Sequence, residues 1–536
     1  MPVSRLSVGC FIMLLATGQL GCGSSSSGTP EGSGGGSSSS GSGGQSATGG
    51  STGSSGSGGS VGSGGTSSTS SGGAKGSGGA VGSGGKPSSG GTTGGGGSVG
   101  GGSGGTVGPG SGGSTTPTGG RTGGGGTAAG GARASGGVMG TAGASGSGAT
   151  TGGNGGSSGG VSSGESNFAG CMAKAGDMKK NMKLPNPFLM HDGTTITTKA
   201  QWECRRAEIK ADLEKYEIGP KQDPSTVTSV KATLSGKSLS VAITTSAGTM
   251  TLTSTVSGSG SCILIGLDSP QSLVTGCTSV PFTSSQVVKS EQDSMQYQSD
   301  PFYKVYPDLW QKIGNYSAWS WGVSRLIDGL EQVKDQLNVD TTKIAVHGCS
   351  YAGKMALFSG ALDERIALTV VEESGGGGIN SWRTSQDFEK NGAPSIEKID
   401  NTNYGWFLPS MQKLDPYSLP HDHHELIAMI APRATIILGN DNYDWLGDES
   451  GYKSTMAALQ VFTALGVADH IGYDFTSPSG QAHCSPPASH QASVKTFTQR
   501  YLQGGTAATN VAIKPSKSSF DLNWMGSIDW TTPTLQ

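Results

Sequence analysis

Three side chains in the C-terminal half of the chain could together carry acyl transfer. Ser350 lies among small residues in HGCSYAGK, Glu373 ends the run IALTVVEE, and His483 lies in SGQAHCSPP. A serine hydroxyl becomes a nucleophile when a histidine takes its proton, and an acid then orients the histidine and stabilises its charged form. These residue types in this order therefore predict a serine nucleophile site.

The surroundings of Ser350 favour this chemistry. The apolar run TKIAVHGC precedes it and predicts a buried strand, and the pattern KMALFSGAL after it predicts a helix. A sharp strand-to-helix bend exposes a serine hydroxyl, and N–H groups at the start of the helix can face a developing oxyanion. The spacing is GxSxxG rather than GxSxG, so an ordinary turn with a serine cap is the alternative.

The acid has several candidates. Glu373 ends a predicted strand, whereas Asp441 and Asp444 follow the next strand, ATIILGND. Glu372 should point to the opposite face from Glu373 if the strand pattern persists. His483 follows the last strand pattern in a loop bounded by Gly and Pro, where an α/β-hydrolase places its histidine. A surface histidine in a loop is the alternative.

Alternating strand and helix patterns should position these groups. SAWSWGVSRLIDGLEQVKDQL has helical periodicity, with Trp321, Leu326 and Leu330 on one face. STMAALQVFTALG and SVKTFTQRYL predict further helices, and HIGYDFTS predicts a strand. This alternation predicts a parallel sheet with helices on both faces and an active site at the carboxyl ends of its strands. SLSVAITTSAGTMTLTSTV predicts an antiparallel meander at the edge of that sheet.

The chain divides into three parts by composition. Residues 1–21 predict a secretory signal, and Gly21-Cys22 resembles a lipobox that would make Cys22 a lipidation site. Ordinary secretion is the alternative. Residues 22–164 are almost entirely Gly, Ser, Thr and Ala, which predicts a disordered tether. Residues 165–536 should form the catalytic domain, where acidic residues outnumber basic ones, so no nucleic-acid partner is expected.

Six cysteines remain after Cys10 in the signal and Cys22. In an exported chain they suggest three disulfides, whose pairing the sequence leaves open. We expect neither a metal nor a cofactor, because no CxxC pair or histidine cluster offers a convincing zinc site. His421, His423 and His424 come closest, but they open the helical pattern ELIAMIAPR, which favours a structural role.

Several motifs in this order resemble the glucuronoyl esterases of carbohydrate esterase family 15, as a bacterial member. They are HGCSYAGK, EESGGGG followed by SWR, LPHDHHELIAMIAPR, DWLG and GQAHCSPP. The likeness extends from about Cys171 to Leu502. It implies a three-layer α/β-hydrolase sandwich with a mostly parallel sheet. It also implies cleavage of esters of 4-O-methyl-glucuronic acid on glucuronoxylan, with lignin as the alcohol side.

Carried over by position, the resemblance makes Ser350 the nucleophile, His483 the base and Glu373 the acid. It implies that the side chains contacting the sugar are Lys354, Trp445, Glu397 and Asn403. It also pairs Cys349 with Cys484 and Cys171 with Cys204, which leaves Cys262–Cys277 as a local addition.

One residue departs from the family pattern. The family usually has an arginine after the nucleophile, which is thought to help stabilise the oxyanion, and this chain has Tyr351 there. A phenol can still donate a hydrogen bond, although more weakly than a cation. The alternatives are therefore a glucuronoxylan-binding protein with little turnover and an esterase for another carbohydrate ester such as acetylated xylan. Lys354 and Trp445 favour the uronate. We expect an exported monomer, either a cell-surface lipoprotein held by a lipid anchor or a secreted protein.

Overall fold

The structure, a computed structural model, describes residues 163–165, 168, 170–268, 273–289, 297–391, 396–402 and 405–536. The expected signal (1–21), Cys22, nearly all of the expected tether (22–164) and Asn403 lie outside the described residues. No helix of the described part is both long enough and apolar enough to cross a membrane.

The strands are β1 (Val227–Ser235), β2 (Ser238–Thr245), β3 (Thr249–Thr255), β4 (Ile263–Gly266), β5 (Thr278–Ser279), β6 (Ile344–Cys349), β7 (Ile366–Glu372), β8 (Ala434–Leu438), β9 (Ile471–Asp474) and β10 (Ala512–Ile513). The α-helices are α1 (Lys199–Leu213), α2 (Pro301–Val305), α3 (Asn315–Leu337), α4 (Tyr351–Leu362), α5 (Trp382–Lys390), α6 (His423–Ala428), α7 (Asp448–Ala464) and α8 (Ala488–Tyr501).

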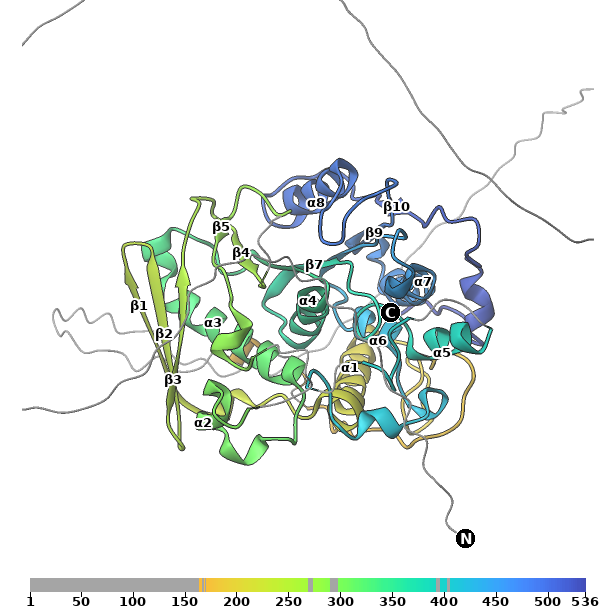
Figure 1. The fold of residues 1–536 in the computed structure, drawn as a ribbon, viewed down its shortest axis with the longest axis horizontal. Helices are drawn as coiled ribbons and strands as arrows, with labels where there is room; N and C mark the ends of the chain where they lie inside the picture. Colours follow the sequence, from red (N-terminus) through yellow and green to blue (C-terminus); the bar gives the residue numbers. More distant parts are fainter. Residues whose placement is uncertain are drawn as a thin grey trace, which may run out of the picture. The chain divides into compact units, whose positions relative to one another are not determined.

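A seven-stranded parallel sheet lies at the centre of the fold, in the order β10-β9-β8-β7-β6-β4-β5. Figure 1 shows α4 beside its middle strands and α8 beyond β7. Because the strands run parallel, their carboxyl ends meet at one edge of the sheet, and the residues that follow β6, β7 and β8 are brought together there.

Consecutive residues of the middle strands are buried on opposite faces of this sheet. On β6, Ile344 and Val346 belong to the core that includes α4, whereas Ala345 belongs to a second core. That second core contains Val494 and Phe497 of α8. Burial on both faces explains why these strands are almost continuously apolar in sequence. The result is the three-layer arrangement that the sequence predicted.

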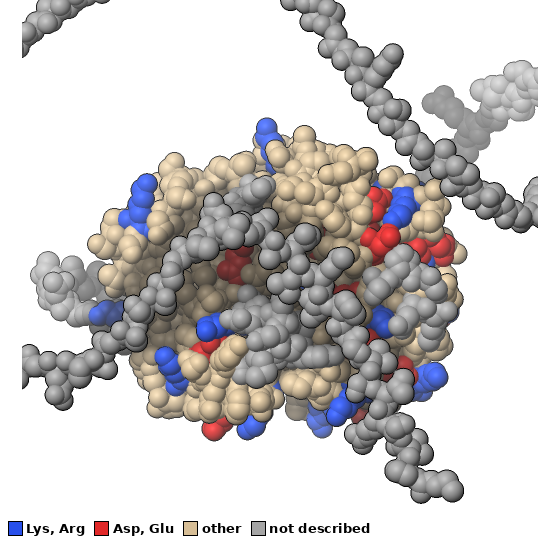
Figure 2. Space-filling view, viewed as in Figure 1, with Lys and Arg blue, Asp and Glu red and all other residues tan. Residues whose placement is uncertain are grey.

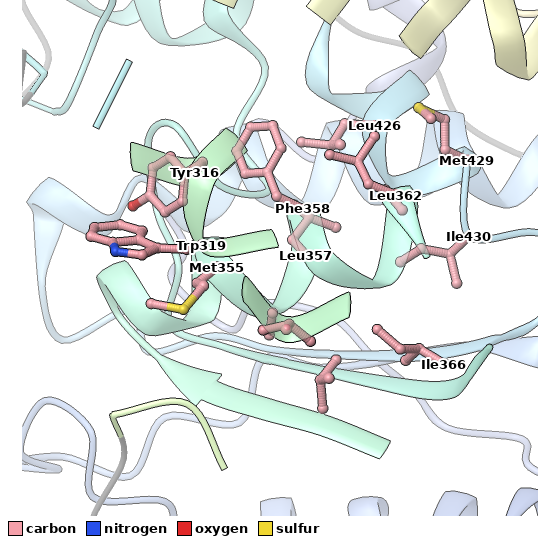
Figure 3. Packing of buried hydrophobic residues seen from close by; sticks show 14 of the residues in the cluster. Tyr316, Trp319, Met355, Leu357, Phe358, Leu362, Ile366, Leu426, Met429 and Ile430 are labelled. Atoms are coloured by element: carbon pink, nitrogen blue, oxygen red, sulfur yellow. The ribbon is translucent and has the colours of Figure 1, made fainter. Parts of the chain in front are cut away.

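The larger core joins α3 to α4, which begins at the candidate nucleophile. Tyr316 and Trp319 of α3 face Met355 and Phe358 of α4 (Figure 3), and the rings of Tyr316 and Phe358 stack at 5.0 Å between centroids. Instead of one apolar face, α3 is buried on almost every side over its first sixteen residues. The packing therefore holds the first turns of α4 rigidly.

The antiparallel meander forms, but its predicted position at the edge of the main sheet is wrong. Strands β1, β2 and β3 make a separate three-stranded sheet. The inward face of β2 lies directly on α3, since a Cβ added at Gly329 would come within 2.4 Å of Val241. This close contact places the small sheet across the helix, where it cannot pair with the main sheet.

The described part of the domain begins with a buried ionic contact. The carboxylate of Glu165 is paired with Lys221 and with Arg325 of α3, and all three side chains are almost fully buried. On the uncovered part of the face in Figure 2, basic and acidic side chains lie among one another rather than in a single basic band.

Candidate active site

Ser350 occupies a sharp bend between β6 and α4. Its backbone is left-handed (φ 59°), and its N–H donates to the Glu372 carbonyl oxygen at 3.0 Å. The bend needs glycine on both sides. A Cβ at Gly348 would lie 2.2 Å from the Ala352 oxygen, and one at Gly353 would lie 2.4 Å from the Glu372 oxygen. The second glycine of GxSxxG is therefore explained by the close approach of α4 to β7.

Glu373 follows β7 and carries a buried carboxylate whose oxygens both accept hydrogen bonds. One oxygen, Oε2, lies 2.6 Å from His483 Nδ1 and accepts the Cys484 N–H at 3.0 Å. The other, Oε1, accepts from Asn440 at 3.2 Å and Gln481 at 3.3 Å. These contacts hold the carboxylate in one orientation. With a proton on Nδ1 directed at Glu373, the lone pair of His483 is on Nε2, which makes Nε2 the basic atom.

A disulfide joins the nucleophile strand to the histidine loop. Cys349, which precedes Ser350, is bonded to Cys484, which follows His483, with 5.7 Å between the two Cα atoms. The other two bridges are Cys171–Cys204 and Cys262–Cys277, so the structure contains the two pairs that the resemblance implied and the pair expected as a local addition. Three disulfides indicate that the protein is exported to an oxidising compartment.

This site does not offer a metal centre. Among the described residues, Cys349, Glu373, His483 and Cys484 form the one group of ligand-type side chains close enough to hold an ion. The two sulfur atoms form a disulfide, and the carboxylate and imidazole are hydrogen-bonded to one another, so these groups are already engaged.

The other acids of the region have different partners. Glu372 pairs with His347 at 3.0 Å on the opposite side of β7, and Asp444 pairs with Lys517. The N–H of Asp441 donates to Ser477 Oγ at 2.7 Å. Of the four candidate acids, the structure brings Glu373 to His483.

A further carboxyl, Asp448, lies behind the candidate acid. It is 3% exposed at the start of α7, and burial, followed by the charges of Asp441 and Glu373, raises the pKa of Asp448 to about 8. We expect it to be protonated at neutral pH. This protonation could not be predicted from the sequence, because an acid in the first turn of a helix is normally a solvated residue.

Trp445 and Tyr443 line the exposed side of the histidine. Trp445, in the short 3₁₀ helix η8 (Asp444–Leu446), is 45% exposed, and its ring meets the edge of His483 at 4.8 Å between centroids. The hydroxyl of Tyr443 accepts the His483 N–H at 3.0 Å. Tyr443 was not predicted, because an aromatic residue in a loop carries no motif of its own.

Lys354 is buried one helical turn beyond Ser350, and Glu397 holds its charge. The Lys354 ammonium lies 2.7 Å from Glu397 Oε2 and 5.2 Å from the centroid of Trp406. The structure thus brings together two of the residues expected to contact the sugar. Asn403, expected to be the fourth, cannot be placed because it lies outside the described residues.

Tyr351 is hydrogen-bonded to a carboxylate, Asp268, that was not predicted from the sequence. Its phenol donates to Asp268 Oδ2 at 3.1 Å, and its ring stacks on Trp406 at 5.8 Å between centroids. Asp268 has a left-handed backbone (φ 43°) just past β4, and its Oδ1 also accepts the Ser284 N–H at 3.1 Å. A single acid after a short strand gave no recognisable pattern in the sequence.

The histidines considered as zinc ligands are buried around Glu217. His421 lies 2.7 Å from one oxygen of Glu217, and His423 lies 3.0 Å from the other. Burial alone would lower the pKa of each histidine, but the charge of Glu217 outweighs it and raises both pKa values. Burial lowers the pKa of the third histidine, His424. These contacts favour a structural role.

The α/β-hydrolase class is defined by a serine with a left-handed backbone conformation between a parallel strand and a helix. A carboxylate and a histidine lie at neighbouring strand ends. Comparison with known proteins gives the family. A family model of the fungal glucuronyl esterases matches residues 230–466. The 4-O-methyl-glucuronoyl methylesterase of Hypocrea jecorina is 36% identical over 386 residues, covering 68% of this chain and 80% of that protein.

Two solved structures are similar over nearly their whole length. The catalytic domain of the Hypocrea jecorina glucuronoyl esterase has a TM-score of 0.61 and 34% identity, covering 67% of this chain and 98% of that one. A mutant glucuronoyl esterase from Sporotrichum thermophile, in complex with methyl 4-O-methyl-β-D-glucopyranuronate, has a TM-score of 0.61 and 31% identity, covering 68% and 99%. The chain belongs to the glucuronoyl esterase family, carbohydrate esterase family 15, and is a carboxylic ester hydrolase.

Proposed function

We propose that this enzyme hydrolyses esters of 4-O-methyl-glucuronic acid on glucuronoxylan, including ester links to lignin alcohols. The observation that carries the proposal is the Glu373–His483 hydrogen bond, joined through Cys484 and Cys349 to the Ser350 bend. The Sporotrichum thermophile relative in complex with a methyl glucuronate ester supports the choice of the uronate.

In the proposed mechanism, Ser350 attacks the ester carbonyl while His483 Nε2 takes the hydroxyl proton. Glu373 stabilises the imidazolium. The tetrahedral oxyanion faces the N–H groups at the start of α4, beginning with that of Tyr351. The alcohol leaves with the proton from His483, which forms the acyl-enzyme. Water, deprotonated by His483, then attacks the acyl-enzyme and releases the glucuronic acid and free Ser350.

The sugar would be held on the side of Lys354, Glu397 and Trp445. Lys354 and Glu397 are already paired, so each can add a hydrogen bond to a sugar hydroxyl without an unpaired buried charge. The exposed ring of Trp445 offers an apolar face beside the base. Asn403 would add a polar contact, as its place in the family pattern implies.

The alternative of an acetyl esterase, or of a binding protein, is tested with three ligands. We expect the purified protein to hydrolyse a benzyl glucuronate ester and Ser350→Ala to lower kcat by roughly 10³-fold or more. Turnover of acetylated xylan in preference to the glucuronate ester would show the wrong substrate class. Binding of glucuronoxylan oligosaccharides without hydrolysis would instead show a binding protein.

We also propose that the domain is a monomer tethered to the cell surface through a lipid on Cys22. The Gly/Ser-rich composition of residues 23–164 supports a flexible link between the anchor and the enzyme. Fractionation of cells that produce wild type and Cys22→Ser tests the anchor. Loss of the protein from the membrane fraction in Cys22→Ser is the expected result, and equal distribution would contradict it.

A further inference from the structure

A second pocket lies next to the site, between α5, α7 and the C-terminal segment. Its volume is about 270 Å³, and its lining includes Phe388 of α5, Ile396, Asp444, Glu449 of α7 and Phe520. Figure 1 shows α5 below α7, on the same side of the molecule as the end of the chain. The mechanism proposed above does not use this pocket.

Two segments that line the pocket also carry side chains of the candidate site. Ile396 precedes Glu397, which binds the ammonium of Lys354 at 2.7 Å. Asp444 precedes Trp445, whose ring meets His483. The pocket and the sugar side of the candidate site are therefore built on the same two segments, through neighbouring residues.

The lining combines aromatic faces with carboxylates whose charges are largely balanced. Phe388 and Phe520 are half-buried, and the ammonium groups of Lys453 and Lys517 lie 5.8 and 5.5 Å from their respective ring centroids. Lys517 pairs with Asp444, and Lys453 pairs with Glu449 at 2.9 Å. Apolar walls with a few fixed polar groups are typical of small-ligand sites.

Resting on the proposed function, we infer that this pocket is a subsite for a neutral pyranose of the xylan main chain that carries the glucuronate. The two phenylalanines would contact the apolar face of the ring. The carboxylates of Asp444 and Glu449 would accept hydrogen bonds from its hydroxyl groups.

The chemistry of the lining favours this sugar over two other occupants. A second uronate would have to compete with Asp444 and Glu449 for Lys517, which lines the pocket, and for Lys453, since each lysine is already paired with one of these carboxylates. An aromatic lignin unit offers few hydroxyl donors, so it would leave those carboxylates without new partners while displacing their water. The position beside Glu397 also matches the sugar end of the ester rather than its alcohol end.

Two substrates with the same alcohol and the same uronate separate the pocket from the catalytic site. One is the benzyl ester of 4-O-methyl-glucuronic acid alone, and the other is the same ester linked to xylotriose. We expect Phe520→Ala and Phe388→Ala each to lower kcat/KM for the xylotriose substrate about 5- to 10-fold through a higher KM, because the contact is equal in ground and transition states. The single-sugar ester should change less than about twofold.

Met525→Ala is the matched control. Met525 is 65% exposed in the same C-terminal segment and does not line the pocket, so its loss should leave both substrates unchanged. An equal fall for both substrates in Phe520→Ala would show a merely structural role and overturn the subsite. Unchanged kinetics with both would also overturn it. An effect that depends on benzyl rather than methyl as the alcohol would assign the pocket to the alcohol instead.

A binding measurement keeps the subsite testable if the esterase assignment itself fails. Xylotetraose carries no ester and no uronate, so its affinity does not depend on turnover. We expect wild type to bind xylotetraose measurably by titration and Phe520→Ala to weaken that binding about 5-fold or more. The control Met525→Ala should bind it as wild type does. Absence of xylotetraose binding by wild type, together with equal kinetics on the two esters, would contradict the inference.

Discussion

The two sides of Ser350, the proposed nucleophile, are held in different ways. On the base side, His483 is bonded to a carboxylate that accepts four hydrogen bonds, and a disulfide joins its neighbour Cys484 to the nucleophile strand. On the oxyanion side, the phenol of Tyr351 is bonded to Asp268. The base and its acid are thus held firmly together in this chain, whereas we expect charge stabilisation to depend on backbone N–H groups beside a paired phenol.

The largest effect should come from breaking the base side at its acid. Glu373→Gln removes the charge that orients and stabilises His483, while Glu372 and Asp444 are paired elsewhere. We expect kcat on the benzyl glucuronate ester to fall about 10²- to 10⁴-fold, with KM changed little, as measured by steady-state kinetics.

The neighbouring acid provides the control for that variant. Glu372, the last residue of β7, directly precedes Glu373 and is equally buried, but it is paired with His347 on the other side. Glu372→Gln should leave kcat within a few-fold of wild type even if it lowers stability. Similar losses of kcat in the two variants would show that any buried charge change at this strand end disturbs the site, and the assignment of Glu373 would fail.

Removal of the Cys349–Cys484 disulfide, which holds the base side alone, should have the next largest effect. Cys349→Ala with Cys484→Ala should lower the free energy of unfolding by about 3–5 kcal/mol, because the bridge closes a loop of 135 residues. It should also lower kcat about 10-fold, since small displacements of base and nucleophile are costly. Chemical denaturation and kinetics on the same samples measure both.

Removal of the Cys262–Cys277 bridge is the matched comparison. That bridge spans 15 residues and lies away from Ser350 and His483 in sequence. Its double alanine variant should lose about 3 kcal/mol of stability and keep its kcat. If both double variants kept full kcat, the catalytic bridge would be a stability device without a role in positioning.

The base side was predictable from the sequence because its signals are local. The small residues around Ser350, the strand that ends at Glu373 and the Gly/Pro-bounded loop at His483 each mark a strand end, and parallel strands bring their ends together. The spacing GxSxxG became clear only from the approach of Gly353 to β7.

The oxyanion side and the position of the small sheet were not predictable in this way. Asp268 and Tyr351 are 83 residues apart, and neither a period nor a motif connects them. The raised pKa of Asp448 arises from burial against Asp441 and Glu373, which only the folded chain brings together. The meander pattern was correct, but contact with Gly329 of α3 decided which sheet it joined.

A pH-dependent effect on the base side concerns the protonation of Asp448, which lies near Glu373. The unfolded carboxyl ionises above about pH 4, whereas the folded one stays protonated until pH approaches its pKa of about 8. The folded state therefore binds more protons in this window, so stability falls as pH rises from about 4 to 8. Asp448→Asn should remove that slope and be more stable than wild type at pH 8 by roughly 5 kcal/mol, because each unit of the shift of about 4 units is worth about 1.4 kcal/mol.

Denaturation curves at several pH values between 4 and 9 measure this effect. Asp444→Asn is the control, because Asp444 is exposed and paired with Lys517 and should leave the slope as in wild type. Curves for Asp448→Asn that run parallel to wild type across the whole range would show that Asp448 is ionised in the folded protein.

The smallest effect is expected on the oxyanion side, and it decides what Tyr351 does. Tyr351→Phe leaves the Asp268 carboxylate without the phenol donor. The negative charge of Asp268 is then less compensated and should disfavour the developing oxyanion. We expect kcat to fall about 2- to 5-fold with little change in KM. The double variant Tyr351→Phe with Asp268→Asn should recover wild-type kcat, because the uncompensated charge is then gone.

Tyr351→Arg should raise kcat by less than about tenfold, since an ion pair with Asp268 would occupy part of the guanidinium. If Phe changes nothing and the double variant equals the single one, then neither the phenol nor Asp268 acts on the reacting carbonyl. The weaker side of the site would in that case rest on backbone N–H groups alone.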